Sequence, residues 1–286
     1  MGLLMQATKD IPRPALRYHG GKWILAPWII SHFPAHRVYV EPYGGAASVL
    51  LRKPRSYAEV YNDMDGEVCN VFRVLRNPAQ ARELERLLQL TPFAREEFEE
   101  SYLDDGDPIE QARRTIVKSF MGFGSDAIRS LYGTGFRANS NRSGTTPAHD
   151  WTNYPHQVAS FTSRLQGVMI ENRPAVEVIA QHDGRETLHY LDPPYVHQTR
   201  GRSHVHRYLV EMSDLDHREL AEVLHAVRGM VVLSAYPCGL YDELYADWRC
   251  VQRPALADGA RPRTECLWLS PAVQECGQRM LPLEAP

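Results

Sequence analysis

The stretch from Arg37 to Leu51 constrains the fold of this 286-residue chain most, because it holds three structural signals in one short run. Apolar residues up to Val40 predict a buried strand. The sequence Glu-Pro-Tyr-Gly-Gly after it predicts a tight turn, and the residues beyond the turn predict a helix. A strand, a glycine turn and a helix in this order form the first unit of a nucleotide-binding α/β fold. We therefore predict a parallel sheet built from such units.

A second strand, Tyr57 to Tyr61, follows this unit and ends in Asn62-Asp63. Asp63 stands eighteen residues after Gly45, a spacing at which a carboxylate accepts hydrogen bonds from ribose hydroxyls. The alternative is that Asp63 caps a helix that starts at Gly66. A nicotinamide oxidoreductase would share this pattern, but the chain lacks the Gly-x-Gly-x-x-Gly sequence that such a fold prefers.

The segment from Thr187 to Tyr195 predicts an active site. Thr187 to Leu191 alternates like a strand, and the prolines at 193 and 194 cannot continue a central strand, so Asp192 should stand at its carboxyl end. Ligands of open α/β sheets bind at that end. The prolines offer carbonyl acceptors and no N–H donors, a frame that suits a donor-rich group such as the amino group of adenine. The alternative is a strand that runs into an ordinary proline turn.

A mostly helical region separates these two parts of the sheet. Residues 67–160 carry helical periodicity, and we predict that they form a smaller domain inserted into a discontinuous catalytic domain of residues 1–66 and 161–286. Within the insertion, Ser125 to Arg142 is rich in Gly, Asn, Ser and Arg, which predicts a long functional loop or hairpin. A second basic segment, Val196 to Arg207, follows the predicted active site and contains three arginines, three histidines and no acid. Both segments can attract phosphate although the net charge is −3.

Composition limits the class of protein further. The chain is 43% hydrophobic and has no apolar run near ~18 residues, so we expect a soluble globular protein without a membrane span. The first residues lack the pattern of a secretion signal, which predicts a cytoplasmic location. The five cysteines form no Cys-x-x-Cys pair, and we expect neither a structural metal nor a disulfide framework.

Three motifs resemble those of one enzyme family. Asp192-Pro-Pro-Tyr195 resembles the signature of DNA amino-methyltransferases, and Glu41-Pro-Tyr-Gly-Gly45 resembles the first motif of the DNA adenine methylase (Dam-like) group. Tyr18, two positions before Gly20-Gly-Lys22, is similar to the N-terminal cofactor motif of the same group. The runs 164–173 and 265–269 look nearest to phage or prophage adenine methylases.

The resemblance implies a Rossmann-like class I methyltransferase sheet with an inserted, mostly helical target-recognition domain. It implies transfer of a methyl group from S-adenosylmethionine to adenine N6 in double-stranded DNA, with the base flipped out of the duplex. The resemblance and the residue patterns together give three sets of expected site residues. The catalytic set is Asp192, Pro193, Pro194 and Tyr195, with Tyr195 as a stacking face. The cofactor set is Tyr18, Lys22, Glu41, Tyr43, Gly44, Gly45, Asp63, Glu171, Asn172 and Asp192. The DNA set, taken from the two basic segments, is Arg129, Arg137, Asn139, Asn141, Arg142, Arg200 and Arg202.

The chain departs from the family pattern at Pro174, where related sequences usually carry an acid near the adenine of the cofactor; Glu171 or Asn172 would substitute for it. Glu41 has a structural alternative, because it could serve as an ordinary buried hydrogen-bond acceptor. An RNA methyltransferase, a cytosine-N4 methyltransferase and a catalytically silent DNA-binding relative remain as alternative functions. The sequence gives neither the recognition site nor the oligomeric state. It leaves open whether a restriction endonuclease partner exists.

Overall fold

A computed structural model describes most of the chain. The described residues are 11–18, 20–124, 134–139, 144–196, 212–257 and 261–279. They divide into two compact units. The first holds the described residues within 1–26, 45–54 and 65–170, and the second holds those within 27–44, 55–64 and 171–286. The predicted helical insertion falls inside the first unit, which also contains segments that we assigned to the catalytic domain; the predicted domain boundaries stay a prediction.

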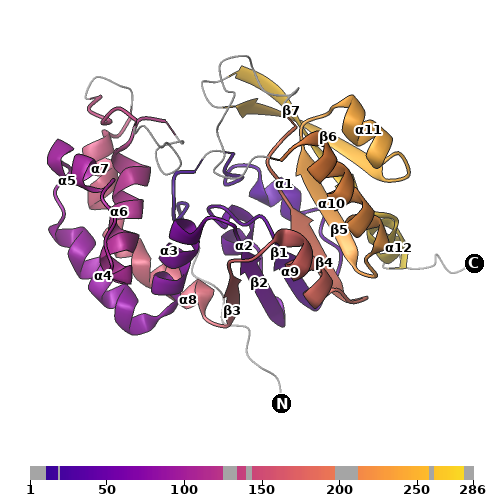
Figure 1. Cartoon of the computed structure of the whole chain (residues 1–286), viewed down its shortest axis with the longest axis horizontal. Coiled ribbons are helices and arrows are strands. Elements are labelled where there is room, and N and C mark those ends of the chain that lie inside the picture. Colours follow the sequence, from indigo (N-terminus) through magenta and orange to yellow (C-terminus); the bar gives the residue numbers. More distant parts are fainter. Residues whose placement is uncertain are drawn as a thin grey trace, which may run out of the picture. The chain divides into compact units, whose positions relative to one another are not determined.

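The fold is a mixed α/β fold with a seven-stranded, mostly parallel sheet of order β3-β2-β1-β4-β5-β7-β6 (Figure 1). This confirms the predicted Rossmann-like class. The strands are β1 (Val38–Glu41), β2 (Ala58–Asn62), β3 (Val168–Glu171), β4 (Thr187–Leu191), β5 (Met230–Ala235), β6 (Arg249–Ala257) and β7 (Arg261–Leu269). Within the second unit, β1 pairs in parallel with β2 and β4, and β4 with β5. The sheet ends in antiparallel pairs, because β7 runs antiparallel to both β5 and β6.

Apolar side chains explain why these segments form the middle of the sheet. Every residue of β4 and β5 is buried, as expected for parallel strands with both faces covered. The helices of the second unit are α9 (Ala175–His182), α10 (Asp214–Ala226), α11 (Gly239–Leu244) and α12 (Pro271–Arg279), and α1 (Ala26–Ile30) lies almost wholly in it. Ser213 and Asp216 form a reciprocal capping box at the start of α10. Leu220 and Leu224 of α10 pack into the same apolar core as Leu191 and Leu233.

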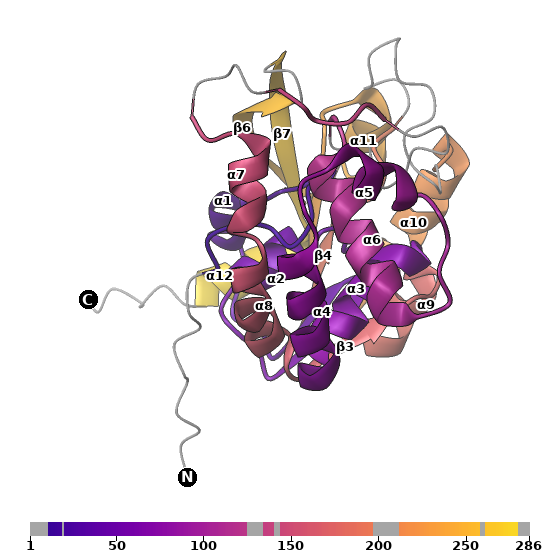
Figure 2. The ribbon, with the colours of Figure 1, turned by 90° about the vertical axis from the view of Figure 1, so that its left-hand side faces the viewer.

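The first unit is built from helices, as predicted for most of its length (Figure 2). They are α2 (Ser48–Arg52), α3 (Gly66–Arg76), α4 (Pro78–Leu90), α5 (Arg95–Glu100), α6 (Pro108–Met121), α7 (Pro147–Thr152), the 3-10 helix Pro155–Gln157 and α8 (Val158–Leu165). Side chains of Asp65, Asn77 and Asp107 cap α3, α4 and α6 by accepting from backbone N–H groups of the first turn. Among the described residues, none of these or the other helices is long and apolar enough to cross a membrane.

The N-terminal segment is held against the helices of the first unit. The guanidinium of Arg13 lies over the Phe120 ring at 5.1 Å and donates to the carbonyl of Asp150. The Arg17 N–H donates to the hydroxyl of Ser119 at 2.6 Å, and that hydroxyl donates back to the Arg17 carbonyl. These contacts place the residue that follows, Tyr18, at a defined position beside α6.

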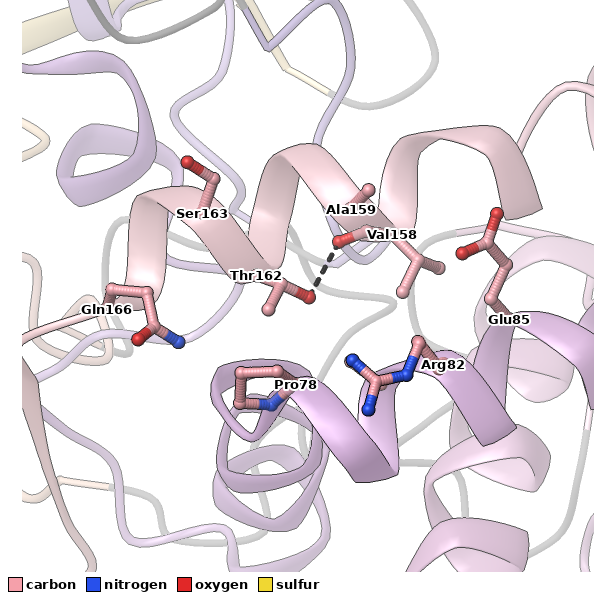
Figure 3. A pocket seen from close by; sticks show the side chains of 9 residues that line it. Pro78, Arg82, Glu85, Val158, Ala159, Thr162, Ser163 and Gln166 are labelled. Atoms are coloured by element: carbon pink, nitrogen blue, oxygen red, sulfur yellow. Dashed lines mark hydrogen bonds between the residues drawn. The ribbon is translucent and has the colours of Figure 1, made fainter. Parts of the chain in front are cut away.

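A shallow cavity of about 290 Å³ lies between α4 and α8 of the first unit (Figure 3). Arg82 and Glu85 contribute from α4, and Val158 and Thr162 contribute from α8. None of the predicted site residues lines this cavity. It is therefore a feature of helix packing, separate from the site described below.

Candidate active site

The carboxyl ends of parallel strands bring the predicted catalytic and cofactor residues of the second unit to one edge of the sheet. β1 ends at Glu41, β2 at Asn62 and β4 at Leu191. Because these strands are parallel neighbours, the residues that follow them emerge at the same edge. Asp192 comes directly after β4, which confirms the predicted position of this acid.

The Asp-Pro-Pro-Tyr segment leaves the strand in a partly enclosed position. Pro193 and Tyr195 are buried, whereas Asp192 and Pro194 are half-buried. The carboxylate of Asp192 is thus reachable from the edge of the sheet, while the segment that carries it is packed. This combination suits a group that must accept hydrogen bonds from a bound molecule without moving.

Tyr195 is held from two sides. Its hydroxyl donates to Glu265 Oε1 at 2.6 Å, and its ring meets Tyr236 edge-on with centroids 4.5 Å apart. Burial raises the pKa of Tyr195 well above its ordinary value, and the negative charge of Asp192 raises it further. The side chain therefore stays a neutral donor. The sequence analysis included Glu265 in the run 265–269 but did not predict this contact.

Glu41 and Asp63 take different positions at this edge. Glu41 is buried and accepts a 2.7 Å hydrogen bond from the Tyr39 hydroxyl, which is the structural contact that the alternative interpretation predicted. Burial and the adjacent Glu41 charge raise the pKa of Tyr39. Asp63 does not cap α3, because Asp65 accepts from the first-turn N–H groups instead. The helix-cap alternative for Asp63 is therefore wrong.

Asn62 ties the loops around the predicted cofactor residues together, a role that sequence reasoning missed. Its side-chain amide donates to the carbonyls of Pro42 at 2.8 Å and Arg173 at 3.0 Å, and its Oδ1 accepts from the Arg173 N–H at 2.9 Å. Its own carbonyl accepts from Gly44 N–H. The side chain is fully buried. The only signal for this role was the position of an amide at the end of a strand.

Asn172 and Pro174 follow β3, where the chain departs from the family pattern. The Asn172 amide donates to the carbonyl of Asp63 at 2.8 Å, so this residue orients the backbone of the predicted ribose acceptor. Pro174 stands at the N-cap of α9 and supplies no side-chain cap. Glu171 is half-buried at the end of β3.

The glycines after β1 are required by close packing. A side chain on Gly44 would collide with the ring of Tyr61, within the second unit. Gly45 has a φ of +47°, which glycine adopts without strain, and a Cβ there would lie 2.8 Å from Cε1 of Tyr18, within the first unit. Tyr43 is partly buried against the apolar core of the second unit. The predicted turn at Gly44-Gly45 is thus a place of close backbone approach.

The N-terminal motif forms a compact turn in the first unit. The N–H of Gly21 donates to the carbonyl of Tyr18, and the Lys22 ammonium donates to the carbonyl of Gly20 at 2.9 Å. Lys22 is 5% exposed. The structure therefore brings Tyr18, Lys22 and Gly45 into one unit and presents the Tyr18 ring against the glycine turn.

An isolated antiparallel bridge pairs Gly122, just before the predicted recognition loop, with Phe136 inside it. The Phe123 N–H donates to the Gly135 carbonyl and the Arg137 N–H donates to the Met121 carbonyl, each at 2.7 Å. The Phe136 ring lies 5.9 Å from the ring of Phe98 in α5. Asn139 is exposed, and the Arg137 guanidinium lies near the carbonyl of Phe120. The other predicted DNA contacts lie outside the described residues: Arg129, Asn141, Arg142, Arg200 and Arg202.

Residues 18–255 match the model of the D12 class N6 adenine-specific DNA methyltransferase family. The match begins at Tyr18 and includes every predicted catalytic and cofactor residue. No curated protein was found to match the chain. The family acts on adenine in DNA, so the interpretations as an RNA or cytosine-N4 methyltransferase are set aside. The chain belongs to the D12 class of N6 adenine-specific DNA methyltransferases and uses S-adenosylmethionine as its methyl donor.

Proposed function

We propose that the chain methylates a flipped adenine in double-stranded DNA at Asp192-Pro-Pro-Tyr195, and that the inserted domain, above all the loop from Ser125 to Arg142, recognises the DNA sequence. The observation that carries the catalytic assignment is the placement of Asp192 at the carboxyl end of β4, next to a proline carbonyl and a buried aromatic ring. The insertion boundaries 67–160 belong to the same proposal.

The chemistry follows from the acceptors at this position. The Asp192 carboxylate and the Pro193 carbonyl accept hydrogen bonds from the two N–H groups of the adenine amino group. These hydrogen bonds draw the nitrogen lone pair out of conjugation with the ring. The methyl group would then pass from the sulfonium of bound S-adenosylmethionine to this nitrogen, with S-adenosylhomocysteine as the leaving group and the displaced proton released to water. Because the acceptors are held in place before the reaction, they stabilise the positive charge that develops on nitrogen without reorganising. S-adenosylmethionine supplies the electrophilic methyl group when bound.

The residues around the glycine turn fit this cofactor. Asp63 presents a carboxylate at the end of β2 that can accept from ribose hydroxyls, and its backbone is oriented by Asn172. Gly44 lets the Tyr61 ring pack directly against the turn, which fixes the backbone at this position. In the first unit, the Tyr18 ring lies against Gly45, and the buried Lys22 supplies a cation whose ammonium donates to the carbonyl of Gly20. Glu41, Tyr43 and Glu171 complete the proposed cofactor set.

The DNA contacts and partners are proposed from charge. Arg137 and Asn139 are the described members of the recognition set, and Arg pairs with guanine as Asn pairs with adenine through two hydrogen bonds each. The substrate is double-stranded DNA, and no restriction endonuclease partner is required by this assignment. A cytoplasmic location is also proposed, because the substrate of the protein is DNA.

Expression in a methylation-free bacterial host tests the proposed function. Single-molecule sequencing of the native genomic DNA should show N6-methyladenine in one short sequence context with the parent chain and none with Asp192→Ala. Modified adenine without a sequence preference would contradict the recognition part. Unmodified DNA from a host that accumulates folded protein would contradict the proposal as a whole.

A further inference from the structure

Glu265 is a buried carboxylate that the reaction described above does not use. It lies on β7 with 3% of its surface exposed, next to Cys266, which pairs with Ala235 at the end of β5. One of its oxygens, Oε1, accepts from the Tyr195 hydroxyl at 2.6 Å and from the Ser234 hydroxyl at 2.7 Å. Two hydroxyl donors on a single oxygen are the arrangement expected around a carboxylate acceptor.

A buried carboxylate is a poor way to stabilise this fold. Taking a charge out of water costs several kcal/mol, and apolar replacements of buried charged groups are often neutral or stabilising. A phenylalanine at 195 over an apolar residue at 265 would fill the same space without that cost. The placement of the charge beside the Asp-Pro-Pro-Tyr segment therefore points to the site rather than to folding.

The contacts of Glu265 restrain the Tyr195 ring, which is the proposed stacking face. A tyrosine ring is free to turn about its side-chain bonds unless both its face and its hydroxyl are held. In Tyr195 the hydroxyl is held by Glu265, and the ring is held by Tyr236 at 68° between planes. Ser234 in turn holds the carboxylate from β5. The orientation of the ring is thus set before any base arrives.

We propose that Glu265 is a positioning residue that orients the Tyr195 ring for stacking against the flipped adenine. This inference rests on the proposed function, because it assumes that the flipped base meets Tyr195. Holding the ring in advance removes the loss of conformational freedom that would otherwise accompany base binding.

A double-mutant cycle tests whether Glu265 acts through the Tyr195 hydroxyl. The variants are Glu265→Met, which removes the acceptor at similar size, Tyr195→Phe, which removes the donor, and the double variant. The substrate is a duplex that carries the sequence found methylated in genomic DNA. Each single variant should lower the single-turnover methylation rate by about 10- to 100-fold, the range for a lost hydrogen bond to a charged group. The double variant should be no slower than either single variant.

Stacking itself is measured with 2-aminopurine at the target position, because stacking on an aromatic ring quenches its fluorescence. Both single variants should make the flipped base brighter than the parent does, while S-adenosylmethionine affinity by calorimetry stays unchanged. Glu265→Gln keeps an acceptor oxygen and should recover most of the rate. Glu275→Gln, an exposed residue of α12, is the matched control and should behave as the parent.

The proposal is overturned if Tyr195→Phe keeps the parental rate and quenching, a result that holds even if Glu265→Met fails to fold. It is also overturned if Glu265→Met slows the Tyr195→Phe variant as much as it slows the parent, because the carboxylate would then act by another route. Failure of the proposed function looks different: the parent itself would not methylate adenine.

Discussion

Replacing Asn62 should both destabilise the protein and loosen the edge of the sheet at which the predicted cofactor residues lie. Asn62→Ala removes three hydrogen bonds, at 2.8, 3.0 and 2.9 Å, that join the loops after β1 and β3 to the end of β2. At about 0.5–1.5 kcal/mol net for each bond, the free energy of unfolding should fall by about 2–4 kcal/mol. Asn62→Asp keeps the size but turns a carboxylate toward two carbonyl oxygens, so it should be at least as destabilising.

Urea unfolding measures this change, with an unaltered m-value showing that the same surface is exposed on unfolding. Calorimetry should show weaker S-adenosylmethionine binding in the same variant, because the loops that carry Gly44 and Asp63 lose their link. Asn153→Ala is the matched control, since this exposed amide makes one bond, to the carbonyl of His149, and its loss should cost less than about 0.5 kcal/mol. If the free energy of unfolding of Asn62→Ala is within about 0.5 kcal/mol of that of the parent, Asn62 does not link the loops after β1 and β3 as proposed.

Three further changes test separate parts of the structure. Asp63→Ala should weaken S-adenosylmethionine binding in calorimetry by about 10- to 100-fold, the range for a lost hydrogen bond to a charged group. Asp65→Ala should lower the stability of α3 and leave that affinity unchanged. Equal affinities in the two variants would contradict the assignment of Asp63 to the cofactor. Phe136→Ala removes the ring that packs 5.2 Å from Phe93 and anchors the predicted recognition loop, so sequencing should show a relaxed or lost site preference; an unchanged methylated-site profile would show that this anchor is not needed for recognition. Burial lowers the pKa of His189 to about 4 in the folded protein, from 6.5 in the unfolded chain. The unfolded chain therefore binds the proton first, and the free energy of unfolding falls as the pH falls from about 6.5 to 4. His189→Leu should flatten this loss in urea titrations across that window, and an equally steep loss in the variant would contradict the cause.

Local patterns predicted the parts of the site that depend on neighbours in the chain. The alternating strand pattern of Thr187–Leu191 stops just before Asp192 and the two prolines, and β4 ends at Leu191. Ser213 and Asp216 are three residues apart, the spacing of a capping box, and they form one. Hydrophobic period and turn chemistry act over a few residues, so the sequence carries them directly.

Contacts between distant segments could not be predicted in this way. Tyr195 and Glu265 are 70 residues apart and meet because β7 lies antiparallel to β5 in one particular register. A shift of that register by one residue would turn Glu265 to the other face of the sheet. Asn62 likewise gained its role from the loop after β3, which the local sequence around it does not reveal. The sequence suggested Asp63 as the alternative cap of α3, whereas the structure shows Asp65 in that position.

The most direct test of the catalytic claim compares purified parent and Asp192→Ala on unmethylated DNA with S-adenosylmethionine. Mass spectrometry of the digested nucleosides should find N6-methyladenine with the parent and none with the variant, while urea unfolding shows both folded to the same extent. A variant that transfers methyl groups at more than about a tenth of the parental rate, a barrier change under ~1.4 kcal/mol, would show that Asp192 is not the acceptor on which the reaction depends.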